Sequence, residues 1–181
     1  MPESIESIIH EEWSDLDVDA DRMLHWIKKE RVFHEFAHAR APFVHHLRGT
    51  FAILSHWRQA QETARCGLLH SAYTRDGFYF RYFDITDEAD RVKLAGVVGA
   101  PAELQIYKYC ASTNFMSFTK PAPGKLLEPH MIVMGDPIPA GGIDCPTRLD
   151  PGLTIHLSCH DIAAYLVVLV ADLAEQMTPV F

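Results

Sequence analysis

The sequence has 181 residues, of which 48% are hydrophobic and 22% are charged. At roughly 150 residues per domain, this length predicts one domain, which buries about two-thirds of its unfolded surface without needing disulfides. Sixteen basic residues against 24 acidic ones give a net charge of −8. That balance argues against nucleic acid or an anionic membrane as the partner. The unusual feature is the number of histidines, which is 11.

The cysteines and the apolar runs narrow the class of protein further. The 4 cysteines are widely spaced and form no CxxC pair, which excludes a zinc ribbon or a thioredoxin-like motif. The N-terminus lacks the basic start and apolar run of a signal peptide. The longest apolar run, residues 162–171, has about half the length of a membrane span. We therefore expect a cytoplasmic protein with no membrane partner.

Apolar periodicity predicts helices through most of the first 112 residues, after an acidic N-terminal segment at residues 1–18. Pro42 favours a helix start, because its missing N–H is not needed in the first turn. Thr86 is the expected N-cap of a later helix, with acidic residues in its first turn. The expected helices cover residues 19–39, 42–57, 59–73, 87–97 and 101–112.

A proline- and glycine-rich stretch at residues 113–157 predicts an irregular insertion, with short strands at 131–134 and 153–157. Ser158 and Asp161 then have the spacing of a capping box, in which each residue's side chain bonds the other's backbone N–H. The closing helix is expected to run to about Met177. The sequence thus predicts a mostly α fold in a single domain of residues 1–181.

On the predicted helix at residues 42–57, one histidine is expected to point into the protein core. At about 100° per residue, His46 lies at the centre of the apolar face, whereas His45 and His56 lie near its edge. The residues that share the face with His46 are Phe43, Gly49, Thr50, Ile53 and Trp57. A buried histidine needs partners for both ring nitrogens. His46 is therefore either a hydrogen-bonded core residue or a metal-binding or catalytic group.

A second histidine, His70, is predicted to point inward from the helix at residues 59–73. It shares its face with Cys66 and with Gly67, which allows a neighbouring helix to approach closely. Two inward histidines on consecutive helices favour a site over two unrelated core residues.

A carboxylate on the closing helix is a candidate partner. Asp172 follows the apolar run, and a buried carboxylate is costly unless it is paired or binds a metal. The alternative is that Asp172 lies beyond the buried part of the helix.

Residues 34–38 match HExxH, the pattern by which zinc peptidases present two histidines and a glutamate on one helix face. A chain with many histidines also produces this pattern by chance, and no third histidine follows at metzincin spacing. His130, in the insertion, is a further residue that could reach a site or simply lie at the surface.

Two longer motifs resemble a bacterial family of unknown function with HD-domain-like helices. The first is HHLRGTFAIL at residues 45–54, and the second is CGLLHSAY at residues 66–73. The second motif departs from the family pattern at Thr74 and Arg75. Weaker matches are His38-Ala39-Arg40, eight residues before His46, and the ADLAEQ segment at residues 171–176.

The wider resemblance is to the HD superfamily of metal-dependent phosphohydrolases. It implies an HD-like helical bundle in which His46, His70 and Asp172 are metal ligands. Ser71 stands where the superfamily has the aspartate of its His-Asp pair, which argues against a two-metal site. The remaining set is that of one Fe, Mn or Zn ion, with His38 or His130 as a further ligand.

From these residues we expect a metal-dependent hydrolase acting on a small-molecule substrate. The expected catalytic residues are His46, His70, Ser71 and Tyr73, and the expected substrate-binding residues are Arg40, Arg48 and Thr50. Two alternatives stay open: an Fe(II)-dependent oxygenase, lyase or isomerase, and a metal-free ligand-binding or accessory protein. The apolar last helix is also a candidate surface for a homodimer.

Overall fold

The computed structural model describes residues 13–30, 32–38, 41–73, 80–122, 124–126, 128–150 and 152–177. The chain is mostly helical, as the sequence predicts. Its helices are α2 (Trp13–Leu16), α3 (Ala20–Lys29), α4 (Val32–Glu35), α5 (Phe43–His56), α6 (Gln61–Leu68), α7 (Glu88–Val98), α8 (Ala100–Ala111) and α9 (Cys159–Met177). Its strands are β1 (Ala37–His38), β2 (Ala41–Pro42), β3 (Met116–Ser117), β4 (Ile132–Val133), β5 (Ile143–Pro146) and β6 (Thr154–Leu157).

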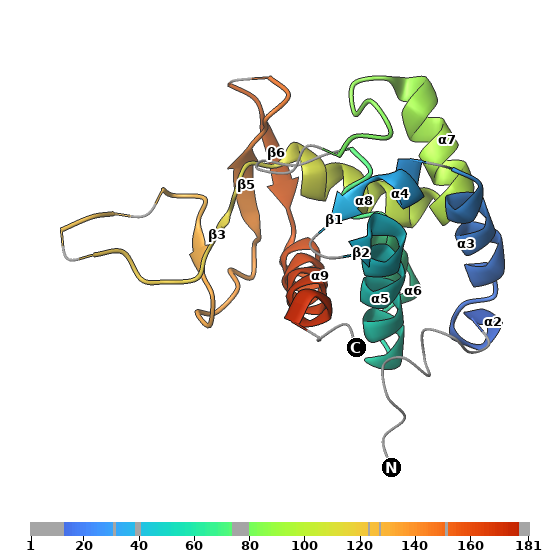
Figure 1. Ribbon diagram of the computed structural model, residues 1–181. Coiled ribbons are helices and arrows are strands. Elements are labelled where there is room, and N and C mark those ends of the chain that lie inside the picture. The colour runs from blue at the N-terminus through green and yellow to red at the C-terminus, as the bar shows by residue number, and fades with distance from the viewer. Residues whose placement is uncertain are drawn as a thin grey trace, which may run out of the picture.

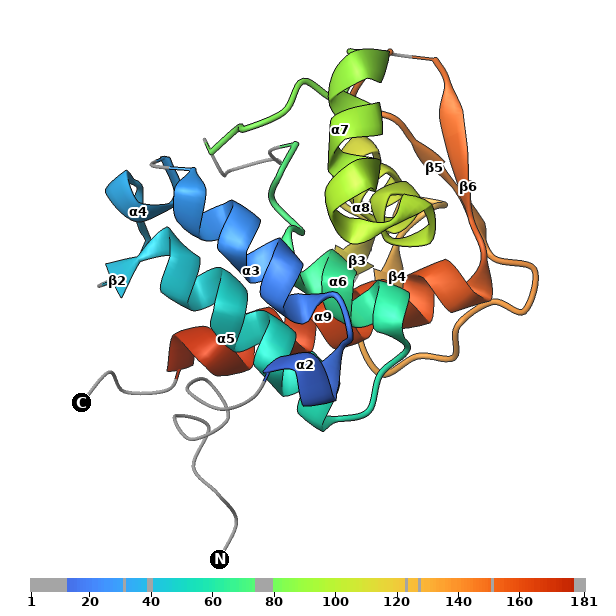
Figure 2. The same cartoon turned by 90° about the vertical axis from the view of Figure 1, so that its right-hand side faces the viewer.

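Helix α5 lies at the centre of the helical part, with α6 and α9 packed against it (Figure 2). It begins after Pro42, as predicted, and most of its side chains are buried. A methyl group on Gly67 of α6 would clash with Leu54 of α5 and press on Thr50. The close approach predicted for Gly67 is therefore confirmed, and it brings the segment after α6 near α5.

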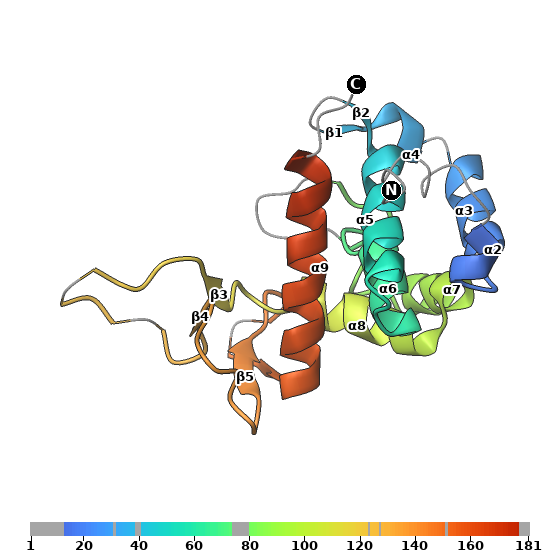
Figure 3. The ribbon, with the colours of Figure 1, turned by 90° about the horizontal axis from the view of Figure 1, so that it is seen from below.

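Helix α9 lies beside α5 and runs in the opposite direction (Figure 3). The predicted capping box is confirmed: the Ser158 N–H donates to Asp161 Oδ2 at 2.9 Å, and the Asp161 N–H donates to Ser158 Oγ at 3.1 Å. Ile162, Tyr165 and Val168 are fully buried. Because the two helices are antiparallel, the first half of α5 meets the last half of α9.

The predicted helix at residues 19–39 is wrong beyond Lys29. A separate turn of helix, α4, follows, and then β1 pairs antiparallel with β2. Phe33 and Phe36 account for the break, because they turn toward Phe80, with ring centroids 5.2 Å and 5.0 Å away. His34 thus lies in α4 and His38 in β1, so HExxH does not lie on one helix, as the zinc-peptidase pattern requires.

Two other helix limits differ from the expectation. Helix α6 ends at Leu68 rather than at residue 73, so His70 lies in a turn and not on the helix. The N-cap of α7 is Asp87, whose carboxylate accepts from the Ala89 N–H at 2.9 Å. Thr86 instead donates to Asp84 Oδ1 at 2.7 Å. A carboxylate one residue closer to the helix displaced the threonine as the cap.

The insertion projects from the helical part as two small ribbons (Figure 1). The predicted strands are present as β4 and β6, and each pairs with a strand that the sequence did not predict. β3 pairs parallel with β4, and β5 pairs antiparallel with β6. In the described ranges, no helix combines the length and hydropathy needed to cross a membrane.

A candidate metal centre between α5, α6 and α9

The fold brings together three side chains that the sequence singled out. His46 lies in the first half of α5, Asp172 in the last half of α9, and His70 in the turn after α6. The antiparallel packing of α5 and α9 brings the first two together (Figure 3). His46 is 4% exposed and His70 is 6% exposed, so both histidines are buried as predicted.

The His46 ring is held on every side. Its Nε2 lies 3.1 Å from Asp172 Oδ1, and its Nδ1 lies 2.5 Å from Glu175 Oε2. One face stacks on Phe43, with centroids 5.6 Å apart, and the ring meets His70 edge-on at 5.4 Å. The imidazole therefore has one defined orientation.

The His70 ring is oriented by its own backbone. Its Nδ1 lies 2.7 Å from the carbonyl oxygen of Gly67, and a carbonyl only accepts hydrogen bonds. Nδ1 therefore carries a proton, and in the neutral ring Nε2 carries the lone pair. The Cys110 thiol donates to the His70 carbonyl at 3.2 Å, which fixes the turn behind the ring.

Charge in the cluster is set by the two carboxylates. Burial lowers the pKa of His46, but the hydrogen bonds that its ring donates to Asp172 and Glu175 outweigh burial and raise that pKa to about 9. Burial likewise raises the pKa of Asp172, but the hydrogen bond to His46 and the positive potential of His70 lower it to about 2. Without a metal, His46 is thus an imidazolium between two carboxylates near neutral pH.

The donor set fits one divalent metal ion. One ligand atom from each of His46, His70 and Asp172 can be chosen so that all lie within 4.8 Å of one another. An ion about 2.0–2.2 Å from nitrogen and oxygen ligands requires separations of roughly 3–4 Å, so a small adjustment suffices. Two imidazoles and one carboxylate suit Fe(II), Mn(II) or Zn(II) and leave coordination positions open.

Thr50 and Ser71 lie next to the cluster in the chain. Thr50, one turn after His46, is fully buried and donates its hydroxyl to the His46 carbonyl at 3.0 Å. Ser71 is 7% exposed and directly follows His70. Thr50 thus supports the helix that carries His46.

Arg48 and Tyr73 are not brought to the cluster. The Arg48 guanidinium lies over the Trp13 ring, 5.3 Å from its centroid. The Tyr73 hydroxyl donates to Glu103 Oε1 at 2.8 Å, and Arg91 Nε donates to the same oxygen at 2.9 Å. Burial and the hydrogen bond to Glu103 raise the pKa of Tyr73 well above its usual value. Tyr73 belongs to a separate polar network between α7 and α8.

The remaining predicted residues complete the comparison. His130 is described but is not a member of the cluster that the structure forms among its described residues. Arg40 and the side chains of His34 and His38 lie outside the described residues. The proposed roles of Arg40 and His38 therefore stay predictions.

Sequence reasoning missed two residues that hold the cluster. Glu175 bonds Nδ1 of His46, and Gln176 Nε2 donates to Asp172 Oδ1 at 2.7 Å. A signal was present in the sequence, because Glu175 follows Asp172 by three residues and so shares its helix face. Identifying its partner required knowing which helix α9 meets.

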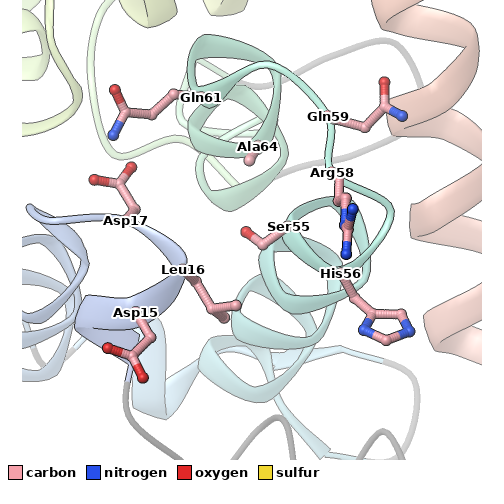
Figure 4. A pocket seen from close by; sticks show the side chains of 9 residues that line it. All are labelled: Asp15, Leu16, Asp17, Ser55, His56, Arg58, Gln59, Gln61 and Ala64. Carbon is pink, nitrogen blue, oxygen red and sulfur yellow. The ribbon is translucent and has the colours of Figure 1, made fainter. Parts of the chain in front are cut away.

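A separate hollow of about 470 Å³ lies at the other end of α5, some ten residues or roughly 15 Å along the helix from His46 (Figure 4). One of its acidic residues, Asp17, is already paired with Arg65. Its lining residues are Asp15, Leu16, Asp17, Ser55, His56, Arg58, Gln59, Gln61 and Ala64. None of them belongs to the histidine cluster.

The fold and the site define a mostly helical protein with a buried cluster of two histidines and one carboxylate. The family model described as "Domain of unknown function (DUF6817)" matches residues 27–113. That range includes His46 and His70, whereas Asp172 and Glu175 lie beyond it. No curated protein matches the chain. No solved structure matches it either.

Proposed function

We propose that this protein is a single-metal enzyme that hydrolyses a small molecule, with His46, His70 and Asp172 as the metal ligands. One observation carries the proposal. Nδ1 of each histidine is bonded to an acceptor, Glu175 in one case and the Gly67 carbonyl in the other, so Nε2 is the ring nitrogen left for the ion; on His46 the ion would replace the proton that Nε2 shares with Asp172. Histidine ligands in metal sites are typically oriented in this way.

Three protein ligands and at least one open position are characteristic of catalytic rather than structural sites. When bound, the ion would supply Lewis-acid activation of water and of the substrate. The side chains of Asp172 and Glu175 are 17% and 22% exposed, against 5% for His46. Solvent and substrate therefore reach the site from the α9 side, while the histidines form its buried wall.

The resemblance to the HD superfamily supports hydrolysis as the reaction and an HD-like arrangement of α5, α6 and α9. Ser71 in place of the second acidic ligand is the reason for proposing one ion and not two. Ser71 follows His70 directly and Thr50 lies one turn after His46, so these two side chains are proposed to contact the substrate, and Arg40 is the proposed anchor for an anionic substrate group.

Two other functions have support from particular observations. The two-histidine, one-carboxylate set is also that of Fe(II) enzymes that act on oxygen or on small metabolites. The direct contact of His46 Nε2 with Asp172 at 3.1 Å supports a metal-free binding protein, in which a proton on His46 balances the carboxylates.

The proposal is tested by activity on a panel of phosphate and carboxylate esters, with protein purified without a histidine tag. We expect hydrolysis that a chelator abolishes and that Mn(II), Zn(II) or Fe(II) restores under nitrogen. His46→Ala, His70→Ala and Asp172→Asn should remove it, whereas His45→Ala, on the exposed side of the same helix, should not. Turnover that requires oxygen would replace the hydrolase by the Fe(II) alternative.

A further inference from the structure

Two carboxylates one turn apart on α9 contact the two ring nitrogens of His46, one each. Asp172 Oδ1 lies 3.1 Å from Nε2 of His46, and Glu175 Oε2 lies 2.5 Å from Nδ1. Glu175 is therefore on the far side of the ring from the point where the ligand atoms converge. It is placed to orient His46 and not to bind the ion.

The backbone of α5 is adapted to this contact. A Cβ atom at Gly49, one turn after His46, would lie 2.5 Å from Cγ and 3.2 Å from Cδ of Glu175. Glycine inside a helix is less stable than alanine, so its presence in α5 has a packing reason. The Glu175 side chain crosses α5 over this glycine to reach His46.

The side chain is also partly shielded from water. Glu175 is 22% exposed, and a carboxylate that loses most of its hydration needs a hydrogen-bond donor. The donor is the Nδ1–H of His46. Because a carboxylate only accepts, this contact keeps a proton on Nδ1, so Nε2, which faces Asp172, is the nitrogen that gives up its proton when an ion binds.

We propose that Glu175 is a positioning residue for the metal centre, which fixes the tautomer and orientation of His46 through a contact that Gly49 makes room for. This inference rests on the proposed metal site. Outer carboxylates that bond a histidine ligand change metal affinity by about 10–100-fold. Glu175 should act on affinity to that extent without being a ligand.

The test is calorimetric titration of Zn(II) into the metal-free full chain, with the absorption spectrum of the Co(II) form as a second readout. Glu175→Ala should weaken binding about 10–100-fold. Glu175→Gln, which keeps an acceptor oxygen but loses the charge, should weaken it less. Gly49→Ala should weaken binding with Glu175 still present, because the added methyl group displaces its side chain.

Glu88→Gln is the matched control, because it removes one exposed carboxylate on α7, which carries none of the cluster residues. This variant should bind Zn(II) as tightly as the wild type does. A merely structural role for Glu175 would lower the melting temperature and leave both the affinity and the Co(II) spectrum unchanged. If the wild type binds Zn(II) and the Glu175 and Gly49 variants bind equally well, this inference alone is overturned. If the wild type binds neither metal, the proposed site is overturned and this inference with it.

Discussion

Two polar clusters in this protein bury carboxylates, and the positive charge that faces those carboxylates differs between the two. In the first, Arg65 donates to both oxygens of Asp17 at 2.6 Å and 2.7 Å, to Asp19 at 2.8 Å and to the Val98 carbonyl at 3.0 Å. In the second, Asp172 and Glu175 face His46, and His70 lies beside it. A permanent cation balances the first cluster, and only imidazoles balance the second.

The difference shows which cluster is structural. Guanidinium keeps its charge at all accessible pH values and matches a carboxylate with two parallel bonds, so the Arg65 cluster is complete as it stands. The His46 cluster reaches balance only when a cation arrives, either a proton or a metal ion. That requirement is what makes it a candidate site.

Removing the permanent cation should have the largest effect. Arg65→Met leaves Asp17 buried without its partner, which typically costs about 3–5 kcal/mol of unfolding free energy. Urea denaturation measures the loss, and Zn(II) affinity of the folded variant should match the wild type. A loss below about 1 kcal/mol would show that the Arg65 cluster is no more than a surface ion pair.

Adding a metal should stabilise only the second cluster. At a free Zn(II) concentration 100 times Kd, binding adds about 2.7 kcal/mol, which for a chain of this size raises Tm by roughly 5–10 °C. Thermal unfolding with and without the ion measures this, and Arg65→Met should retain the increment. Asp172→Asn should lose it, and an equal rise in that variant would place the binding elsewhere.

Both clusters should lose stability at low pH, where Asp17 and Asp172 are protonated, but only the His46 cluster should lose stability at high pH. The pKa of His46 is raised from 6.5 to about 9, so the metal-free fold loses stability as pH rises through that window, by at most about 1.4 kcal/mol per pH unit. Burial raises the pKa of Asp17, but the bonds to Arg65 lower it below 3.8 overall, so this cluster loses stability below about pH 4.

Denaturant titrations of the chelated protein across pH measure both losses of stability, the one at high pH (the alkaline limb) and the one at low pH (the acid limb). His46→Ala should abolish the alkaline limb and leave the part of the acid limb that belongs to Asp17, while the part that depends on Asp172 becomes smaller. Saturating Zn(II) should also abolish the alkaline limb, because the ion takes the place of the proton. An alkaline limb that persists in His46→Ala belongs to another group.

Tyr73→Phe should have the smallest effect. It removes the hydroxyl that bonds Glu103, and the loss of one buried hydrogen bond costs about 1–2 kcal/mol. Because Tyr73 lies in the network of Arg91 and Glu103, metal affinity should not change. A loss of metal binding at unchanged stability would return Tyr73 to the site, where the sequence analysis had expected it.

Local signals in the sequence predicted much of the fold. Helix α5, helix α8 and the Ser158–Asp161 capping box depend on neighbouring residues, and the inward position of His46 follows from the period of the apolar face. His70 is buried as expected, but it lies in the turn after α6 and not on the predicted helix. The break after Lys29 was missed because its cause is the packing of Phe33 and Phe36 on Phe80, about 45 residues along the chain.

The residues of the candidate site were likewise predicted from the sequence only in part. The proposed ligands His46, His70 and Asp172 were identified by residue type and spacing, together with the family resemblance. Glu175 and Gln176 were not, because their partners depend on the register of α9 against α5, and 129 residues separate His46 from Glu175. The contacts described for Tyr73 and Arg48 are with Glu103 and Trp13 and not with the histidine cluster, because nearness in sequence does not determine which face a side chain occupies.

The proposed binding of a metal ion by His46, His70 and Asp172 is tested most directly by the metal content of the chain. Mass spectrometry measures it in protein that is purified without a histidine tag and dialysed after exposure to Zn(II), Mn(II) and Fe(II). We expect one ion per chain in the wild type and in His45→Ala, and none in His46→Ala or His70→Ala. A wild-type chain that retains no ion, or a His46→Ala chain that retains as much as the wild type, would contradict it.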